Sequence, residues 1–203
     1  MKILHIDSSI LGDHSVSRKL TASIVAREKA LHPDATVVHH DFGANPLRYL
    51  SGGHLAAFQG AIVDDASLTA DLVQGSGHID EVFEADVIVI GAPMYNFAIP
   101  AQLKSWIDRI VVAGKTFRYG ANGPEGLVPS GKKVFIGSAR GGIYSAGSPA
   151  AGLDHQESYL KAVLGFIGLT DVTFIRAEGL SKGEDARASA LDQAEAAIGA
   201  LNA

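Results

Sequence analysis

Hydrophobic and polar positions follow two alternating periods along the chain. Short apolar runs, typical of buried strands, occupy residues 2–7, 35–40, 86–91, 132–138 and 171–177. Between these runs the pattern favours helices over 16–31, 51–84, 100–113, 152–167 and 185–201. The run at 86–91 (Asp-Val-Ile-Val-Ile-Gly) is apolar on both faces, which is typical of a central parallel strand.

A strand followed by a helix, five times over, predicts parallel strands joined by right-handed crossovers. We therefore expect an α/β fold, a doubly wound five-stranded parallel sheet with helices on both faces. No nucleotide fingerprint supports a six-stranded sheet, so we expect the strand order 2-1-3-4-5. Gly52, Gly53, Gly60 and the cluster 75–77 are expected to divide the helical region 51–84. Residues 115–129 resemble an inserted hairpin.

Composition narrows the class of protein. The length of 203 residues suggests one domain, 1–203, and 47% apolar with 19% charged residues is enough for a core. The net charge of −5 argues against a nucleic-acid partner. No apolar run reaches the roughly 18 residues of a membrane helix, and Met1–Asp7 is too short for a signal peptide. We expect a soluble, cytoplasmic protein.

The sequence lacks the residues that several classes of site require. The absence of cysteine excludes disulfides, thiolate nucleophiles and cysteine-ligated metals. No G-x-S-x-G elbow supports a serine hydrolase. His39 and His40 are neighbours on one strand and point to opposite faces, so no metal site is predicted. His78 is expected at the surface and His5 within the sheet.

Ligands of open α/β sheets bind beyond the carboxyl ends of the strands, where the strand order reverses. The first loop there, 8–17, opens a helix and carries the hydroxyls of Ser9, Ser15 and Ser17. A helix start with hydroxyl donors favours an anion, and the absence of a dinucleotide or triphosphate motif suggests a single phosphate monoester. Ordinary capping of the helix by Ser15 or Ser17 is the alternative.

The loops after the third and fourth predicted strands complete this edge. The second loop has apolar and aromatic side chains where solvent is expected, with Asn96 among them, which suits a flat heteroaromatic ring. In the third loop, Gly141 and Gly142 let backbone N–H groups approach a ligand, and Arg140 adds charge. Packing under a helix and a plain glycine-rich turn are the respective alternatives. Together the three loops suit FMN.

The chain resembles a known family, the FMN-dependent NADH azoreductases, also described as FMN-dependent NADH:quinone oxidoreductases, which have a flavodoxin-like fold. The segments that carry the resemblance span nearly the whole chain in order. They are 8–11, 15–17, 92–97, 99–104, 116–119, 123–127, 140–142 and 164–168.

The resemblance implies roles for single residues. The phosphate would be held by Ser9, Ser15, Val16 and Ser17, and the ring by Pro93, Met94, Tyr95, Asn96 and Phe97, with Ser138, Ala139, Arg140, Gly141 and Gly142 at its pyrimidine edge. Arg140 and Tyr119 are the candidates for a catalytic role. Members of the family commonly read Ser-Arg-Gly-Gly, and Ala139 replaces that serine, so any hydroxyl contact at this position is lost.

The resemblance also implies an activity and an assembly. A hydride from NADH or NADPH would reduce the flavin, and a quinone or azo compound would accept the electrons at the same face, in a ping-pong mechanism. The active site would lie at the interface of a homodimer, and aromatic side chains would cover it. The alternative is a flavodoxin-like, non-catalytic electron carrier. Segments 51–84 and 115–129 would cover an exposed flavin edge, which favours an enzyme.

Overall fold

The computed structural model describes residues 1–202, which form one parallel sheet with helices on both faces. The sheet order is β2-β1-β3-β6-β7, all strands parallel, and this confirms the predicted order 2-1-3-4-5. The strands are β1 (Lys2–Asp7), β2 (Thr36–Asp41), β3 (Val87–Pro93), β6 (Lys133–Ala139) and β7 (Asp171–Ala177). The fold is thus the doubly wound α/β arrangement that the sequence predicts.

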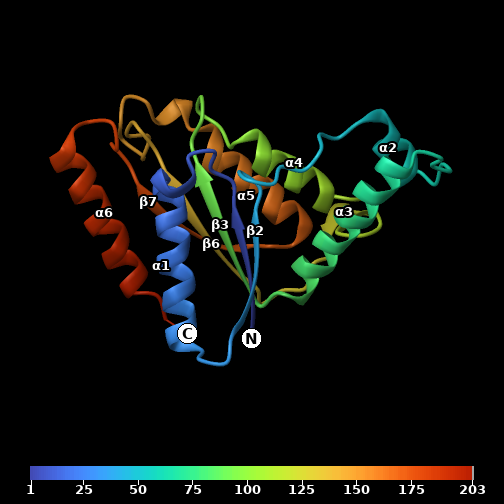
Figure 1. Cartoon of the computed structure of the whole chain (residues 1–203), viewed down its shortest axis with the longest axis horizontal. Helices are drawn as coiled ribbons and strands as arrows, with labels where there is room; N and C mark the ends of the chain where they lie inside the picture. The colour runs from blue at the N-terminus through green and yellow to red at the C-terminus, as the bar shows by residue number, and fades with distance from the viewer. Residues whose placement is uncertain (203) are drawn as a thin grey trace.

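Alternate side chains of each strand pack under different helices. Ile3 of β1 packs with Leu20 and Ile24 of the helix α1, whereas Leu4 and Ile6 belong to the core of the opposite face. The helices α1 (Val16–Leu31) and α6 (Glu184–Gly199) cover the first face, as Figure 1 shows. The other face is covered by α3 (Ala66–Glu84), α4 (Ala101–Ile110) and α5 (His155–Ile167). Two single 3₁₀ turns, Gly12–His14 and Ala151–Leu153, precede α1 and α5.

The helical region 51–84 breaks at one place only. Its helices are α2 (Gly52–Phe58) and α3, with Gly60 in the left-handed region (φ 91°) between them. The expected break at residues 75–77 is wrong, because α3 runs through them. A Cβ on Gly75 would lie 3.1 Å from Cδ of Arg109, so this glycine permits close packing against α4. Gly52 and Gly53 likewise lie inside α2 instead of ending a helix.

The bounds of one helix and the exposure of one histidine differ from the predictions. Pro100 is the N-cap of α4, and this helix ends at Ile110 instead of near residue 113. His5 lies within the sheet, as predicted. His78, expected at the surface, is only 3% exposed, because it lies on the side of α3 that packs against β1 and β2. None of the helices within residues 1–202 combines the length and the apolar character that crossing a membrane requires.

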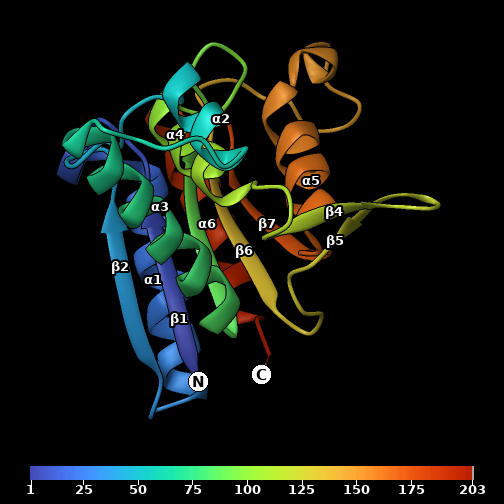
Figure 2. The ribbon, with the colours of Figure 1, turned by 90° about the vertical axis from the view of Figure 1, so that its right-hand side faces the viewer.

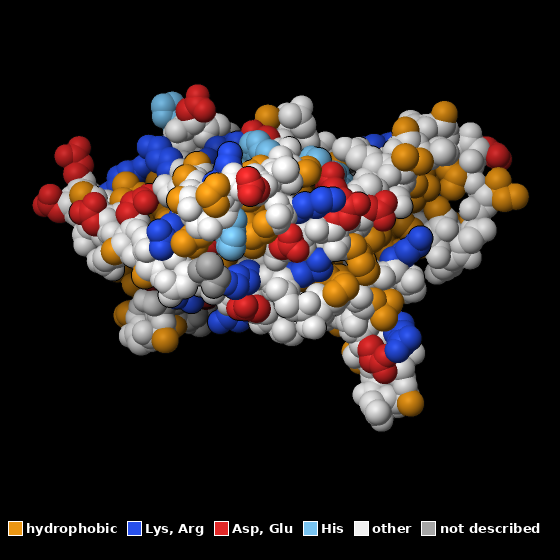
Figure 3. Space-filling view, turned by 90° about the horizontal axis from the view of Figure 1, so that it is seen from below, with side chains coloured by type: hydrophobic (Ala, Val, Ile, Leu, Met, Phe, Trp, Pro, Cys, Tyr) orange, Lys and Arg blue, Asp and Glu red, His pale blue; other side chains and the backbone are white. Residues whose placement is uncertain are grey.

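The predicted hairpin is confirmed. Strands β4 (Phe117–Gly120) and β5 (Gly123–Gly126) pair in antiparallel fashion between α4 and β6. Figure 2 shows the hairpin extending away from the sheet beside α5, and in Figure 3 it stands out as a finger with charges of both signs. At its base the ring of Phe117 packs 4.5 Å, between centroids, from that of Phe166 of α5.

Candidate functional site

The first loop lies across the amino end of α1. Ser15 caps this helix, since its Oγ accepts a hydrogen bond from Arg18 N (3.2 Å), and the same Oγ lies 3.0 Å from Oγ of Ser17. Ser8 fastens the loop to the sheet by donating to the carbonyl of Gly91 (2.6 Å). The first N–H groups of a helix have no partner within it, so donors and hydroxyls converge at this point.

Arg18 connects the first loop to the end of β2. The Arg18 guanidinium donates to the carbonyl of Ser9 (2.8 Å) and makes two bonds of 2.6 Å to Asp41, at the end of β2. These bonds from Arg18 lower the pKa of the Asp41 carboxyl below its ordinary value, although partial burial opposes this. Gly43 must be a glycine here, because a Cβ would lie 2.1 Å from the carbonyl oxygen of Ser9.

The second loop makes a strained turn at the end of β3. Tyr95 and Ala98 exchange two backbone hydrogen bonds (3.0 and 3.1 Å), and between them Asn96 and Phe97 have positive φ angles of 47° and 71°. A bulky residue in the left-handed region is uncommon, and such strain is typical of functional sites. The Tyr95 hydroxyl lies 3.3 Å from Oγ of Ser9, which joins this loop to the first.

The third loop joins the second through main-chain bonds. Met94 N donates to the carbonyl of Ala139 (2.9 Å), and Arg140 N donates to that of Ala177 at the end of β7 (2.9 Å). Ser181 N donates to the carbonyl of Gly141 (3.0 Å), and a Cβ at Gly141 would lie 2.9 Å from Oγ of Ser181. The glycine therefore allows the segment after β7 to approach.

The side chain of Arg140 is wholly buried behind this loop. Its guanidinium donates to Ser138 Oγ (3.0 Å), Glu178 (3.1 Å) and Glu157, and pairs with Asp154 at 3.0 Å. The charge of Arg140 is therefore committed to carboxylates inside the protein. The sequence prediction gave this charge to the ligand, whereas the buried contacts suit a residue that positions the loop.

The three loops and the segment after β7 enclose a polar cavity of about 290 Å³ at the carboxyl ends of the strands. Ten of the predicted cofactor-binding residues line it, namely Ser9, Ser15, Val16, Ser17, Pro93, Met94, Tyr95, Ala139, Arg140 and Gly141. The lining also includes five residues that the sequence reasoning missed, Leu11, His14, Leu180, Ser181 and Arg187. The loop after the fifth predicted strand ends at the same sheet edge, and this was the available signal.

Five other predicted residues lie outside the cavity lining. Ser138 is buried and donates to Oε1 of Gln156 (3.0 Å), while Gly142 follows directly after the lining glycine. Asn96 and Phe97 are on the exposed turn of the second loop, and the Phe97 side chain is 41% exposed. Tyr119 lies on the hairpin and is 76% exposed, so within one chain it does not reach the cavity.

The donor set suits a phosphate monoester joined to a larger polar group. The three serines and the helix start line the cavity from the first loop, and Arg187, in the first turn of α6, also lines it. Within residues 1–202 the guanidinium of Arg187 forms no ion pair, so its charge is free for an anion. These residues therefore fit the phosphate of FMN.

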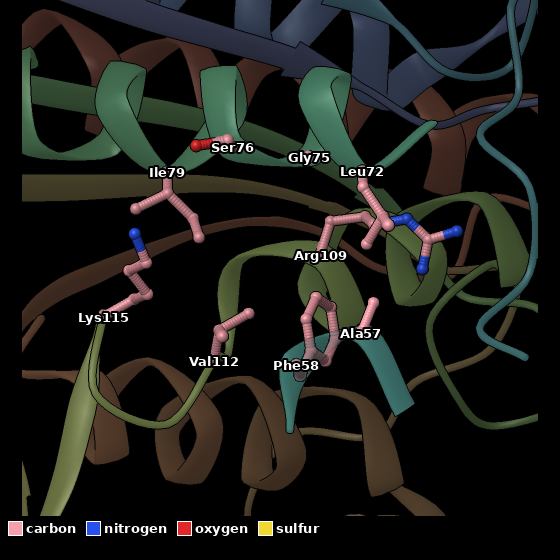
Figure 4. Close-up of a pocket in the computed structure, with 9 residues that line it drawn as sticks. All are labelled: Ala57, Phe58, Leu72, Gly75, Ser76, Ile79, Arg109, Val112 and Lys115. Carbon is pink, nitrogen blue, oxygen red and sulfur yellow. The ribbon is translucent and has the colours of Figure 1, made fainter. Parts of the chain in front are cut away.

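A second cavity, of about 250 Å³, lies between α2, α3 and α4. Figure 4 shows carbon atoms of Phe58, Leu72, Ile79 and Val112 facing it, while the guanidinium of Arg109 points away. That guanidinium donates instead to Asp71 (2.7 Å), which also accepts from His54. No predicted site residue lines this cavity, and besides Arg109 its polar lining residues are Ser76 and Lys115, so we do not take it as the ligand site.

The sheet, its strand-end loops and the polar cavity define a flavodoxin-like protein, and residues 1–201 match the family model described as "Flavodoxin-like fold". The chain is 57% identical to an FMN-dependent NADH:quinone oxidoreductase of Methylocella silvestris, over the full length of both chains. It is 56% identical to one of Sinorhizobium fredii, covering 98% of this chain and 95% of that one. The chain therefore belongs to the family of FMN-dependent NADH:quinone oxidoreductases.

Solved structures of azoreductases resemble this chain in fold. An azoreductase from Bacillus anthracis superposes with a TM-score of 0.83 at 30% identity, covering 99% of this chain and all of that one. An FMN-dependent NADH-azoreductase from the same organism, in complex with FMN, gives a TM-score of 0.86 at 25% identity, with 98% of each chain covered.

Proposed function

We propose that the polar cavity binds FMN and that the protein is an FMN-dependent NADH:quinone oxidoreductase that also reduces aromatic azo compounds. Full-length identity of 57% to a relative of that name supports the activity. The observation that carries the assignment of the site is the convergence of serine hydroxyls, a helix start and a free arginine in one cavity.

The phosphate is held at the amino end of α1. Ser9, Ser15 and Ser17 contribute hydroxyls, and the N–H groups of Val16 and Ser17 contribute main-chain donors. Arg187 supplies the positive charge that the first loop lacks. Arg18 keeps the loop in place through Ser9 and Asp41, and is a positioning residue.

The second and third loops hold the ring. When bound, FMN supplies the transfer of two electrons from the nicotinamide to the acceptor. Pro93 at the end of β3 and Met94 and Tyr95 in the second loop line the cavity, and the strained turn holds Asn96 and Phe97 at its rim. Main-chain N–H groups of Gly141 and Gly142 are the donors for negative charge that develops at the ring. Arg140 positions these glycines from behind through its buried ion pairs.

The substrate side of the site requires a second copy of the chain. A wide groove of about 710 Å³ beside the second loop is lined by Ala98, Ile99, Ala101 and Tyr159 together with Lys104, His155 and Ser158. We infer that this groove is the interface of a homodimer, and that the exposed Phe97 and Tyr119 cover the substrate from the two chains. One face shared by donor and acceptor gives a ping-pong mechanism.

The dimer is tested by light scattering after size exclusion, with Ala101→Glu, which places a charge in the groove on an exposed helical position. We expect a dimer for the wild type and, for the variant, a monomer that retains FMN but loses most quinone reduction. A wild-type monomer with full turnover would contradict the dimer and leave the flavin site untouched.

The function is tested on the purified protein by its visible spectrum and by NADH and NADPH consumption with a quinone and an azo dye. Bound FMN would make the protein yellow. An enzyme would then consume NADH over many turnovers, whereas a non-catalytic carrier would hardly consume it. A colourless protein that takes up no FMN would overturn the proposal. Since NADH is an intracellular donor, we place the protein in the cytoplasm, and cell fractionation tests this.

A further inference from the structure

Two histidines and an aspartate meet on the edge of the sheet, on the face covered by α1. The register of β1 and β2 sets His5 directly opposite His39, and their rings stack with centroids 4.3 Å apart. Both Nε2 atoms approach the same oxygen, Oδ2 of Asp7, at 3.3 Å for His5 and 3.0 Å for His39. The three ligand atoms all lie within 4.8 Å of one another.

One of these nitrogens has no hydrogen-bond partner. His5 is 8% exposed, and within residues 1–202 its Nε2 makes no hydrogen bond, although it faces Asp7. A buried polar atom without a partner costs free energy, so such atoms usually indicate a missing ligand or water. The orphaned nitrogen therefore points at the place where a ligand would complete the cluster.

The charges around the cluster favour a cation. Oδ2 of Asp7 faces both histidines, and Asp7 supplies the negative charge of the cluster. Arg18 lies 3.8 Å from Oδ2 of Asp7, but it is bonded twice to Asp41. The two carboxylates and one guanidinium leave one net negative charge.

The second oxygen of the aspartate is held in place separately. Thr21 of α1 donates a hydrogen bond of 2.9 Å to Oδ1 of Asp7, which leaves Oδ2 directed at the histidines. Such outer contacts orient the carboxylate ligands of metal sites. The side chain of His39 is 46% exposed, so the cluster is open to solvent on one side and an ion can enter.

We propose that His5, Asp7 and His39 bind a divalent first-row transition metal ion of the zinc type. Two imidazoles and a carboxylate are a common ligand set for such ions, with water in the open position. Tetrahedral ligands with bonds of about 2.0–2.1 Å lie roughly 3.3 Å apart, close to the separations of the two nitrogens from Oδ2. The metal would connect the edge strand β2 to β1, close to the first loop.

A second cluster of two histidines and a carboxylate lies nearby and can be compared with the His5 cluster. On the other face of β2, Oε2 of Glu81 lies 2.8 Å from Nε2 of His40 and 3.0 Å from Nδ1 of His78. Both nitrogens that face this carboxylate are already hydrogen-bonded to it. Nε2 of His78 is buried without a partner, but it is the other nitrogen of a ring whose Nδ1 already contacts Glu81. We therefore assign the metal to the His5 cluster alone.

The test is calorimetric titration of Zn²⁺ into the FMN-loaded protein, free of affinity tag and stripped of metal by a chelator. We expect one bound ion per chain. His39→Asn removes a half-exposed ligand and should weaken binding at least about 10-fold, as even outer contacts of metal sites have effects of this size. His40→Asn, the next residue on the same strand, is the matched control and should bind like the wild type.

Thermal unfolding gives an independent readout. Zn²⁺ should raise the unfolding temperature of the wild type and of His40→Asn, but not that of His39→Asn or His39→Gln, because only a bound ligand stabilises the folded state. FMN content should be equal in all of them. Absence of Zn²⁺ binding by the wild type, or equal loss in His40→Asn and His39→Asn, would overturn the proposal without affecting the flavin site.

Discussion

Two cavities of similar size lie in different parts of the molecule and differ in the residues that line them. The polar one, about 290 Å³, is built from strand-end loops, with serine hydroxyls, main-chain donors and a free guanidinium. The apolar one, about 250 Å³, is built from α2, α3 and α4, with alkyl and ring carbons facing it. Volume therefore does not identify the ligand site, whereas convergence of polar groups does.

The exposed surroundings of the two cavities differ too. Beside the apolar cavity, Leu55, Phe58 and Ile62 of α2 and the following loop are 50%, 39% and 91% exposed, and Figure 3 shows hydrophobic side chains at this end of the molecule. The polar cavity is instead tied together by bonds between its loops, such as Met94 to Ala139. The proposed cofactor site is thus preorganised within one chain.

The largest effect is expected for Arg140→Ala. It leaves the carboxylates of Glu178 and Asp154 without their cation and Glu157 with only the partly exposed Arg176, which should lower the free energy of unfolding by about 3 kcal/mol. FMN should also be lost, since the third loop loses its support. Urea unfolding and flavin content measure both.

Arg109→Ala is the matched control, because Arg109 is equally buried and pairs with Asp71 behind the apolar cavity. We expect a comparable loss of stability but unchanged FMN affinity. If both variants lost FMN equally, the distinction between the two cavities would fail.

Ser17→Ala is expected to weaken FMN binding about 10-fold, because a hydrogen bond to a charged phosphate contributes about 1.5 kcal/mol or more. Ser17 does not cap α1, so the helix stays intact. Fluorescence titration of the apoprotein gives the dissociation constant. Ser76→Ala, in the lining of the apolar cavity, should bind FMN as the wild type does. An unchanged constant for Ser17→Ala would remove this hydroxyl from the phosphate site.

Tyr119→Ala should raise the KM for quinone about 2–10-fold and leave FMN affinity unchanged. A change of this size corresponds to the binding free energy of one aromatic contact. The reason is that Tyr119 lies on the projecting hairpin, away from the cavity of its own chain. Steady-state kinetics at saturating NADH measure the effect. Tyr49→Ala, with a similarly exposed tyrosine, is the control. Loss of flavin from Tyr119→Ala would instead assign this residue to the cofactor.

A small pH effect is expected for the clamp under the first loop. The pKa of Asp41 is lowered in the folded state by Arg18, against about 3.9 in an unfolded chain. Its contribution to the free energy of unfolding is thus present above about pH 4 and is lost as the pH falls through the lowered pKa. Acid unfolding of the apoprotein should be less steep in Asp41→Asn, but not in the exposed control Asp34→Asn.

The sequence predicts the strand order and the three loops well, because the buried strand runs and the rule of strand-end ligands need no side-chain directions. It cannot show where a side chain turns. Arg140 is in the predicted loop, but its guanidinium is directed into the protein. Arg187 was missed because only packing of α6 beside the first loop brings it to the cavity. His5 and His39 meet through strand register, which a single strand does not reveal.

The most direct test of the central claim compares FMN with riboflavin, which lacks only the phosphate. If the phosphate is held by the serines and Arg187, the wild-type apoprotein should bind FMN at least about 100-fold more tightly than riboflavin, since several charge-assisted bonds are lost. Combined replacement of Ser9 and Ser17 by alanine should remove most of this difference. Equal affinity of the wild type for both flavins would contradict the account.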